Sequence, residues 1–289
     1  MPPRPAPPPR PGRRPLGDPA CPHLVRRYGG YHLAARTGGG GGAGLAAPDL
    51  TRGLEHVVRR RRGAVEAPGR IGAVKLLLVR HGRTFANVAG ALDTALPGNP
   101  LDAVGVEQAS LLPARLESSG DLDAISSLWV SPVQRARETI APIERATGLA
   151  ARIRPGLREV LAGEMEMNTD VRSVACYTDT TRSWMVGRTA ARIPGSPEDG
   201  ADTFARFNTV VEEIYNSTRT GGTALLVAHG TILRLWVALA AAAAGGADPA
   251  WIANHPMRNT AVSVVEGDPE SGWRLVDWDE GTWRADAVR

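Results

Sequence analysis

Lysine, cysteine and long apolar runs are scarce in this sequence of 289 residues, and each scarcity excludes a class of protein. Two cysteines, Cys21 and Cys176, are too few for a disulfide framework and have no CxxC spacing for a metal site, so we expect a protein of the reducing cytoplasm. No apolar run approaches the ~20 residues that a membrane span needs. The N-terminus has arginine and proline where a signal peptide needs an apolar segment, so we expect neither membrane insertion nor export.

Positive charge is unevenly placed and almost entirely arginine, because Lys75 is the one lysine. Residues 1–74 hold 13 arginines and 4 acidic residues, a net charge of +9, whereas residues 75–289 hold 21 basic and 26 acidic residues, a net charge of −5. The high pI therefore belongs to the N-terminal segment. Abundant Ala, Gly and Pro beside the arginines indicate a GC-rich coding sequence, so the arginine content is weak evidence for a nucleic-acid partner.

The N-terminal segment has the composition of a chain that cannot build a core. Residues 1–20 carry nine prolines, residues 38–42 are five glycines and residues 59–62 are four arginines. Such a segment buries too little apolar surface to offset the entropy of ordering, so we expect residues 1–73 to be a disordered extension, with room for a short helix over residues 50–62. A basic arm that binds nucleic acid or an acidic partner is the alternative that we favour less.

Residues 74–289 alternate short apolar runs with amphipathic segments, the pattern of an α/β domain. This pattern predicts a three-layer α/β/α sandwich with a mostly parallel central sheet and an antiparallel edge strand. Residues 156–200 lack clean periodicity, and we expect a lid insertion at about residues 160–200, built from one or two short helices. The expected strands are 75–79, 124–130, 151–153, 223–227, 261–265 and 273–278, and the expected helices are 101–116, 132–148, 203–215 and 231–243.

Two of these strands end in a histidine followed by a glycine. Val79 leads into Arg80-His81-Gly82, and Val227 leads into Ala228-His229-Gly230. In open α/β sheets ligands bind beyond the carboxyl ends of the strands, so both histidines could reach one crevice. One such histidine is commonly a hydrogen-bonded structural residue, but two of them beside an arginine indicate a site for phosphate.

Four segments resemble, in order, the motifs of the histidine phosphatase superfamily, which contains cofactor-dependent phosphoglycerate mutases and histidine acid phosphatases. LLLVRHGRTFAN (residues 76–87) resembles the signature of the superfamily, and SPVQRARET (131–139) resembles its second arginine motif. Residues 157–166 resemble the catalytic-acid segment, and VAHG (227–230) resembles the second-histidine motif. The resemblance covers about residues 74–279 and implies phosphoryl transfer through a phosphohistidine.

The chemistry of phosphoryl transfer assigns roles to three of these residues without the resemblance. Charge on the equatorial oxygens needs neutralising, which the planar fork of arginine does bidentately, so Arg80 and Arg135 are the expected clamps. A neutral imidazole can attack phosphorus if its other nitrogen is fixed by a backbone acceptor. His81 is the expected nucleophile.

A second group of residues would assist the transfer. His229 would stabilise the transferring group, and the amides of Gly230 and Thr231 at a helix start would add positive potential there. The leaving alkoxide needs a proton from a carboxylic acid, which the attacking water later returns. Glu159 is our choice for this acid, and Glu164 and Glu166 remain open alternatives.

Thr84 and Asn87 lie in the last part of the first motif and have two interpretations. Both side chains favour helix caps, whereas the resemblance makes them phosphate or substrate contacts. Mutases of the superfamily usually carry RHGxSxWN at this point, but here Thr84 stands in place of the serine and Phe85-Ala86 in place of the residue pair that ends in tryptophan. Met167 and the altered segment 194–200 depart further from the mutase pattern. These differences favour a phosphatase.

We therefore predict a metal-independent phosphomonoester hydrolase that needs no cofactor and acts on a small phosphorylated metabolite. A cofactor-dependent phosphoglycerate mutase is the enzymatic alternative. From another class, a non-catalytic protein that binds a phospho-ligand or nucleic acid with its basic tail is the second alternative. We expect no membrane partner, and a monomer or homodimer.

Overall fold

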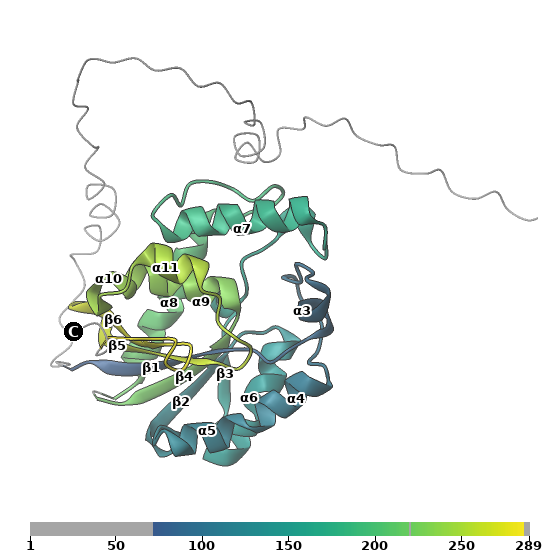
Figure 1. Cartoon of the computed structure of the whole chain (residues 1–289). Helices are drawn as coiled ribbons and strands as arrows, with labels where there is room; N and C mark the ends of the chain where they lie inside the picture. Colours follow the sequence, from purple (N-terminus) through teal and green to yellow (C-terminus); the bar gives the residue numbers. More distant parts are fainter. Residues whose placement is uncertain (1–71, 220, 286–289) are drawn as a thin grey trace, which may run out of the picture.

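The computed structural model describes residues 72–219 and 221–285 (Figure 1). The disorder predicted for the N-terminal extension and the short helix predicted over residues 50–62 fall on residues 1–71, outside this described part. Within it, no helix is long and apolar enough to cross a membrane.

A seven-stranded sheet forms the middle layer, in the order β3-β2-β4-β1-β5-β6-β7. The first four strands of this order run parallel, and β5, β6 and β7 extend the sheet antiparallel from β1. The bounds are Val74–Arg80 (β1), Ile125–Val130 (β2), Ala151–Ile153 (β3), Thr223–Ala228 (β4), Val262–Asp268 (β5), Gly272–Trp278 (β6) and Trp283–Arg284 (β7).

The sheet is buried on both faces because its central strands are continuously apolar. In β1, Leu76 and Leu78 join the core on one face, whereas Leu77 and Val79 join the core on the other. All four side chains are fully buried. Successive residues of a strand point to opposite faces, so an unbroken apolar run is what a strand between two helical layers requires.

Helices cover both faces of the sheet (Figure 1). The lower layer in this view holds α4, α5 and α6, and the upper layer holds α7 to α11, while α3 lies at the side beside the carboxyl end of β1. The bounds are Phe85–Ala89 (α3), Ala103–Ser110 (α4), Leu112–Ser118 (α5), Gln134–Thr147 (α6), Val171–Met185 (α7), Gly200–Ser217 (α8), Gly230–Ala240 (α9), Ala242–Gly245 (α10) and Pro249–Asn254 (α11), with 3-10 turns at Leu122–Ala124, Pro155–Leu157 and Gly163–Met165.

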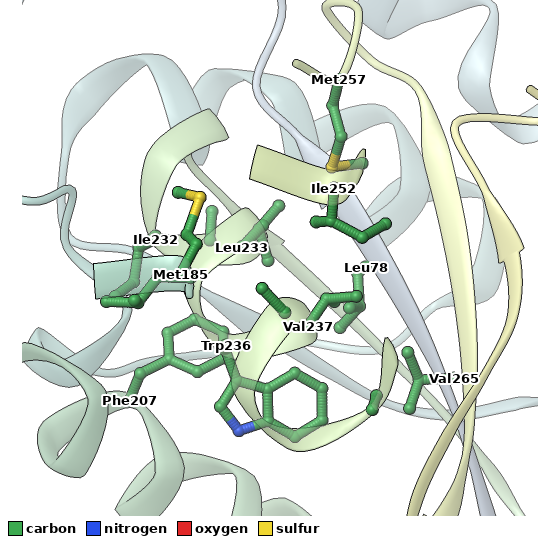
Figure 2. Packing of buried hydrophobic residues seen from close by; sticks show 14 of the residues in the cluster. Leu78, Met185, Phe207, Ile232, Leu233, Trp236, Val237, Ile252, Met257 and Val265 are labelled. Carbon is green, nitrogen blue, oxygen red and sulfur yellow. The ribbon is translucent and has the colours of Figure 1, made fainter. Parts of the chain in front are cut away.

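Helix α9 lies at the centre of the upper core, and Figure 2 shows its buried residues beside residues of α7, α8, α11, β1 and β5. Trp236 packs against Phe207 of α8, with ring centroids 5.9 Å apart, and lies near Val237 and the β1 residue Leu78. Burying side chains of this size contributes about 1.5–3 kcal/mol each. The helix that follows His229 is therefore held rigidly on the sheet.

The predicted α/β/α sandwich is confirmed, and four local expectations change. The helix expected over residues 101–116 is two helices, because Pro113 near the start of α5 has no N–H to continue the hydrogen bonding of α4. The helix expected over 231–243 ends at Ala240 and restarts as α10. The irregular segment 156–200 contains one helix of 15 residues, α7, and the antiparallel part of the sheet holds three strands.

Candidate active site

The sheet register brings the ends of three parallel strands to one edge. Val227 of β4 pairs with Val79 of β1 and with Val130 of β2. Two backbone bonds extend this alignment, from the N–H of His81 to Ala228 O at 3.0 Å and from the N–H of Ser131 to Val227 O at 3.0 Å. The side chains that follow the three strands therefore converge.

A cavity of about 160 Å³ opens at this edge. Eight of the nine residues predicted for the site line it: Arg80, His81, Thr84, Asn87, Arg135, Glu159, Gly230 and Thr231. The ninth, His229, lies against the wall, where its ring centroid is 5.1 Å from that of His81. The structure thus brings together residues from β1, α3, α6, α9 and the segment after β3.

His81 has the hydrogen bonding of a neutral nucleophile. Its Nδ1 lies 2.7 Å from the carbonyl oxygen of Gly82, so Nδ1 carries the proton and donates it to that acceptor. Nε2 keeps its lone pair and accepts from Nε of Arg135 at 3.1 Å. Burial, followed by the charges of Arg135 and Arg80, holds the pKa of His81 well below its usual value. The imidazole is therefore neutral at pH 7, with its lone pair on Nε2.

Arg135 is fixed beside this nitrogen by Asp93. The Nη1 of Arg135 lies 3.2 Å from the carboxylate of Asp93, and Nη2 donates to the Asp93 carbonyl oxygen at 2.8 Å. The side chain is buried, which lowers its pKa, and the charge of Asp93 opposes that shift. The guanidinium stays charged because even a lowered arginine pKa lies far above neutrality.

Arg80 supplies a second cation with unused donors. Its Nη1 donates to the carbonyl oxygen of Met257, whereas its buried Nε has no hydrogen-bond partner among the described residues. A Cβ on Gly230 would lie 3.2 Å from that Nε, so glycine keeps the approach to Arg80 clear. A buried N–H that faces a cavity without an acceptor suits an anionic ligand.

His229 is also buried and neutral. Its Nε2 lies 2.8 Å from the hydroxyl oxygen of Ser131, and its Nδ1 has no partner within the described part of the chain. Burial lowers the pKa of His229 well below its usual value, and the charge of Arg135 adds to the shift. Two neutral imidazoles and two guanidinium groups thus surround one small space.

Glu159 lies at the start of α9 and accepts three backbone hydrogen bonds. Oε1 accepts from the N–H groups of Val160 at 2.8 Å and Ile232 at 2.9 Å, and Oε2 accepts from the N–H of Thr231 at 3.0 Å. The first amides of a helix have no acceptor of their own, so a carboxylate is well placed there. Both oxygens act as acceptors in this arrangement.

The two alternative acids lie elsewhere. Glu164 is exposed and does not line the cavity. Glu166 accepts from the backbone N–H groups of Thr94 and Ala95, at 2.8 and 2.9 Å, and from the Thr94 hydroxyl. It therefore holds the loop after α3 in place. Of the three candidates, Glu159 is the one that lines the cavity.

Thr84 and Asn87 form a capping box at the start of α3. The N–H of Asn87 donates to the Thr84 hydroxyl, and the N–H of Thr84 donates to Oδ1 of Asn87, both at 3.2 Å. Both residues also line the cavity, so the two interpretations of these residues are compatible. Because Oδ1 of Asn87 is occupied as an acceptor, its Nδ2 is the free donor end of the amide.

The model of the histidine phosphatase superfamily (branch 1) matches residues 76–281. The chain belongs to this superfamily. Among curated relatives, a PE-PGRS family protein of Mycobacterium tuberculosis is 31% identical over 70% of this chain, but the match covers only 35% of that protein. The probable phosphoglycerate mutase GpmB of Yersinia enterocolitica is 29% identical over 71% of this chain and 90% of its own.

Solved structures of the superfamily share the fold. A mycobacterial glucosyl-3-phosphoglycerate phosphatase superposes with a TM-score of 0.59 at 27% identity, covering 72% of this chain and all of the other. The alpha-ribazole phosphatase of Shigella flexneri superposes with a TM-score of 0.54 at 23% identity, covering 71% and 96% of the two chains. The second likeness concerns the fold alone.

The sequence did not predict several residues of this cavity. Four of them line it, namely Asp93, Thr94, Tyr177 and Arg234. Three more make hydrogen bonds to its residues: Ser131 to His229, Thr139 to Gly82 and Asn259 to His81. Ser131 and Thr139 belong to the second arginine motif, but the motif does not indicate which hydrogen-bond partners they have. The other five lie in loops or on helix faces where periodicity says nothing about a distant partner. Among the described residues, no group of three or more His, Cys, Asp or Glu is arranged to hold a metal ion.

Tyr177 of α7 and Arg234 of α9 also line the cavity. The Tyr177 hydroxyl donates to the carbonyl oxygen of Val160 at 3.1 Å, and burial raises its pKa well above the usual value. Nη1 of Arg234 donates to the carbonyl oxygen of Ala253 at 3.0 Å. Burial lowers the pKa of Arg234, and the charge of Glu159 opposes that shift. These two residues connect the cavity wall to α7 and α11.

Proposed function

We propose that this chain is a metal-independent phosphomonoester hydrolase that acts through a phosphohistidine on His81. The observation that carries the proposal is the hydrogen bond from Nδ1 of His81 to Gly82 O, which leaves the lone pair on Nε2 at the cavity. A neutral imidazole in that tautomer is a nucleophile that needs no metal to activate it.

The reaction has two displacements at phosphorus. In the first, Nε2 of His81 forms a bond to phosphorus as the bond to the ester oxygen breaks, and the leaving oxygen takes a proton from Glu159. In the second, a water oxygen attacks phosphorus, Glu159 takes back the proton, and the P–N bond breaks to release inorganic phosphate. The Nδ1–H of His81 keeps its proton and its hydrogen bond to the Gly82 carbonyl oxygen throughout. Glu159 must turn one oxygen from an amide toward the cavity to carry that proton.

The remaining polar groups stabilise the transferring phosphoryl group. Arg80 and Arg135 supply N–H donors and positive charge to its oxygens, and the free Nδ2 of Asn87 supplies a further donor. On contact with a phosphate oxygen, the Nε of Arg135 exchanges its present acceptor, His81 Nε2, for that oxygen. His229, whose ring centroid lies 5.1 Å from that of His81, completes the group.

We favour hydrolysis over mutase chemistry because of the residues in the last part of the first motif. Thr84 begins α3 where the mutase pattern has serine, and the buried Ala86 stands where that pattern has tryptophan. The glucosyl-3-phosphoglycerate phosphatase among the solved structures supports a phosphatase, whereas the relative named phosphoglycerate mutase supports the alternative. A small phosphorylated metabolite suits the small cavity. We assign the cavity to a domain of residues 74–289, and we assign the role of a lid over it to α7 and its flanking loops.

A panel of phosphomonoesters tests this function. We expect the purified chain to release phosphate from at least one small ester, with activity unchanged by EDTA and lost in His81→Ala by about 10³-fold or more. A coupled assay with 3-phosphoglycerate, with and without bisphosphoglycerate, tests the mutase alternative. Phosphate release that survives in His81→Ala, or that EDTA abolishes, would contradict the proposal.

A further inference from the structure

The Asn259 side chain joins the backbone of His81 to the side-chain amide of Asn87 in α3. Its Nδ2 donates to the carbonyl oxygen of His81 at 3.0 Å and to Oδ1 of Asn87 at 3.2 Å. A primary amide nitrogen has two protons, so one group can make both bonds at once. Asn259 does not line the cavity, and it lies three residues before the first residue of β5.

The chemistry of the neighbours fixes the orientation of both amides. A backbone carbonyl can only accept, so the Asn259 atom that meets His81 O is the nitrogen. The N–H of Thr84 can only donate, so the Asn87 atom that meets it is the oxygen. With Oδ1 of Asn87 occupied by Thr84 and Asn259, its Nδ2 is the end of the amide that can donate to a ligand in the cavity that Asn87 lines.

The backbone around Asn259 is itself anchored on both sides. The N–H of Thr260 donates to Arg80 O at 3.0 Å, and Thr260 takes a left-handed conformation with φ of 59°. On the other side, Arg258 makes an N–H bond of 3.0 Å and a side-chain bond of 2.9 Å to the carboxylate of Asp279. A residue held between two such anchors can set the position of its partners instead of following them.

The backbone groups of His81 and Gly82, at the end of β1, are each held by a hydrogen bond in the way that follows. The N–H of His81 is held by Ala228, the N–H of Gly82 by the Thr139 hydroxyl at 2.9 Å, and the carbonyl of His81 by Asn259. Loss of the last bond would leave the His81 carbonyl, among the described residues, with only the longer bond from the Thr260 N–H at 3.4 Å. An in-line attack tolerates little displacement of the attacking atom.

We propose that Asn259 is a positioning residue for the reaction: it fixes the His81 backbone and turns the amide of Asn87 toward the phosphoryl group. The proposal rests on the proposed function, because it assumes that His81 and Asn87 meet phosphate. It assigns a role to a segment more than 170 residues away in sequence from the nucleophile. The oxyanion that Asn87 would bind is the tetrahedral or trigonal-bipyramidal phosphoryl group.

Vanadate binding, followed by tryptophan fluorescence and by inhibition of hydrolysis, tests this role. We expect Asn259→Ala to weaken vanadate binding about tenfold, the loss that one hydrogen bond to a polar partner gives. Asn259→Asp keeps the volume but turns an oxygen toward two acceptors, so we expect a larger loss. Asn254→Ala is the matched control, since its side chain donates to Ala250 O within α11 and to no other residue that the structure describes, and it should bind as the wild type does.

A double-mutant cycle with Asn87→Ala separates positioning from general destabilisation. If Asn259 acts partly through Asn87, the loss caused by Asn259→Ala should be about threefold smaller in the Asn87→Ala background. Equal losses in both backgrounds, or wild-type affinity in Asn259→Ala and Asn259→Asp, would overturn the proposal. If the wild type hydrolyses no ester but the variants change vanadate binding as described, the proposed function alone is overturned. If the wild type hydrolyses an ester and the Asn259 variants bind vanadate as it does, only this inference is overturned.

Discussion

At the scale of single residues, the site depends on keeping His81 neutral while surrounding it with positive charge. Burial and the charges of Arg135 and Arg80 all lower its pKa, and only the bond to the Gly82 carbonyl raises it. The same cations that would bind phosphate thus preserve the lone pair that attacks it. One set of charges serves both binding and nucleophilicity.

The carboxyl group of Glu159 gives the sharpest residue-scale prediction. We expect Glu159→Gln to lower kcat for an alkyl phosphate by about 10²–10⁴-fold, because the alkoxide loses its proton source. For 4-nitrophenyl phosphate, whose leaving anion is stable, the loss should be much smaller. Steady-state kinetics on both esters measures the difference.

Glu164→Gln is the matched control for that experiment, because Glu164 is exposed and outside the cavity. It should hydrolyse both esters at the wild-type rate. An equal loss on the two esters in Glu159→Gln would indicate a disturbed start of α9 instead of a missing acid, since Gln would set an NH₂ group against the amides that Glu159 now accepts.

At the scale of elements, two helices press against the loop that carries the nucleophile. Helix α6 supplies Arg135 and the Thr139 hydroxyl to it. Helix α4 approaches from its first turn, where Asp102 caps the helix and accepts from Nε of Arg83 at 2.8 Å. The close approach depends on Gly105, where an added Cβ would lie 2.0 Å from Arg83 O.

Gly105→Ala should therefore move α4 away from the loop. Backbone atoms cannot give way as a flexible side chain can, so we expect a destabilisation of about 1–3 kcal/mol in spite of the better helix propensity of alanine. Urea unfolding measures it. Ser110→Ala, at the exposed end of the same helix, is the control and should stay within about 0.5 kcal/mol. A stabilised Gly105→Ala protein would contradict the packing described for α4.

The sequence predicted those elements whose signal is local. Continuous apolar runs marked β1 and β4, and the His-Gly pairs at their ends marked the cavity, because parallel strands share one carboxyl edge. The division of α4 from α5 could have been read from Pro113. By contrast, the contacts of Asn259 and Asp93 join loops far apart in the chain, and neither residue has a pattern around it. Long-range hydrogen bonds of this kind are set by tertiary packing.

At the scale of the whole molecule, the two helical layers bury both histidines and so connect stability to pH. His81 and His229 have pKa values well below the usual one, mainly through burial. In the unfolded chain each histidine has a pKa of about 6.5, whereas in the folded chain the pKa is lower. At a pH between these pKa values, the unfolded chain therefore binds more protons than the folded one. Stability is then complete above about pH 6.5 and falls as the pH decreases from there.

Urea unfolding between pH 7.5 and 5 measures this dependence. We expect His229→Gln to reduce the slope of the unfolding free energy with pH by up to one proton, or about 1.4 kcal/mol per pH unit. Carboxyl groups with lowered pKa, such as Asp102, act only near and below about pH 4 and do not interfere. An unchanged slope in His229→Gln would show that His229 titrates alike in both states.

The covalent intermediate on His81 is the central claim, and trapping it is the most direct test. The chain is mixed with a phosphomonoester that it hydrolyses, labelled at phosphorus. The reaction is quenched in alkali within one turnover, and the protein is digested for mass spectrometry. The account predicts an acid-labile phosphoryl group on His81, and none in His81→Ala. Label on another residue, or rapid hydrolysis by the wild type with a label-free His81 at every quench time, would contradict it.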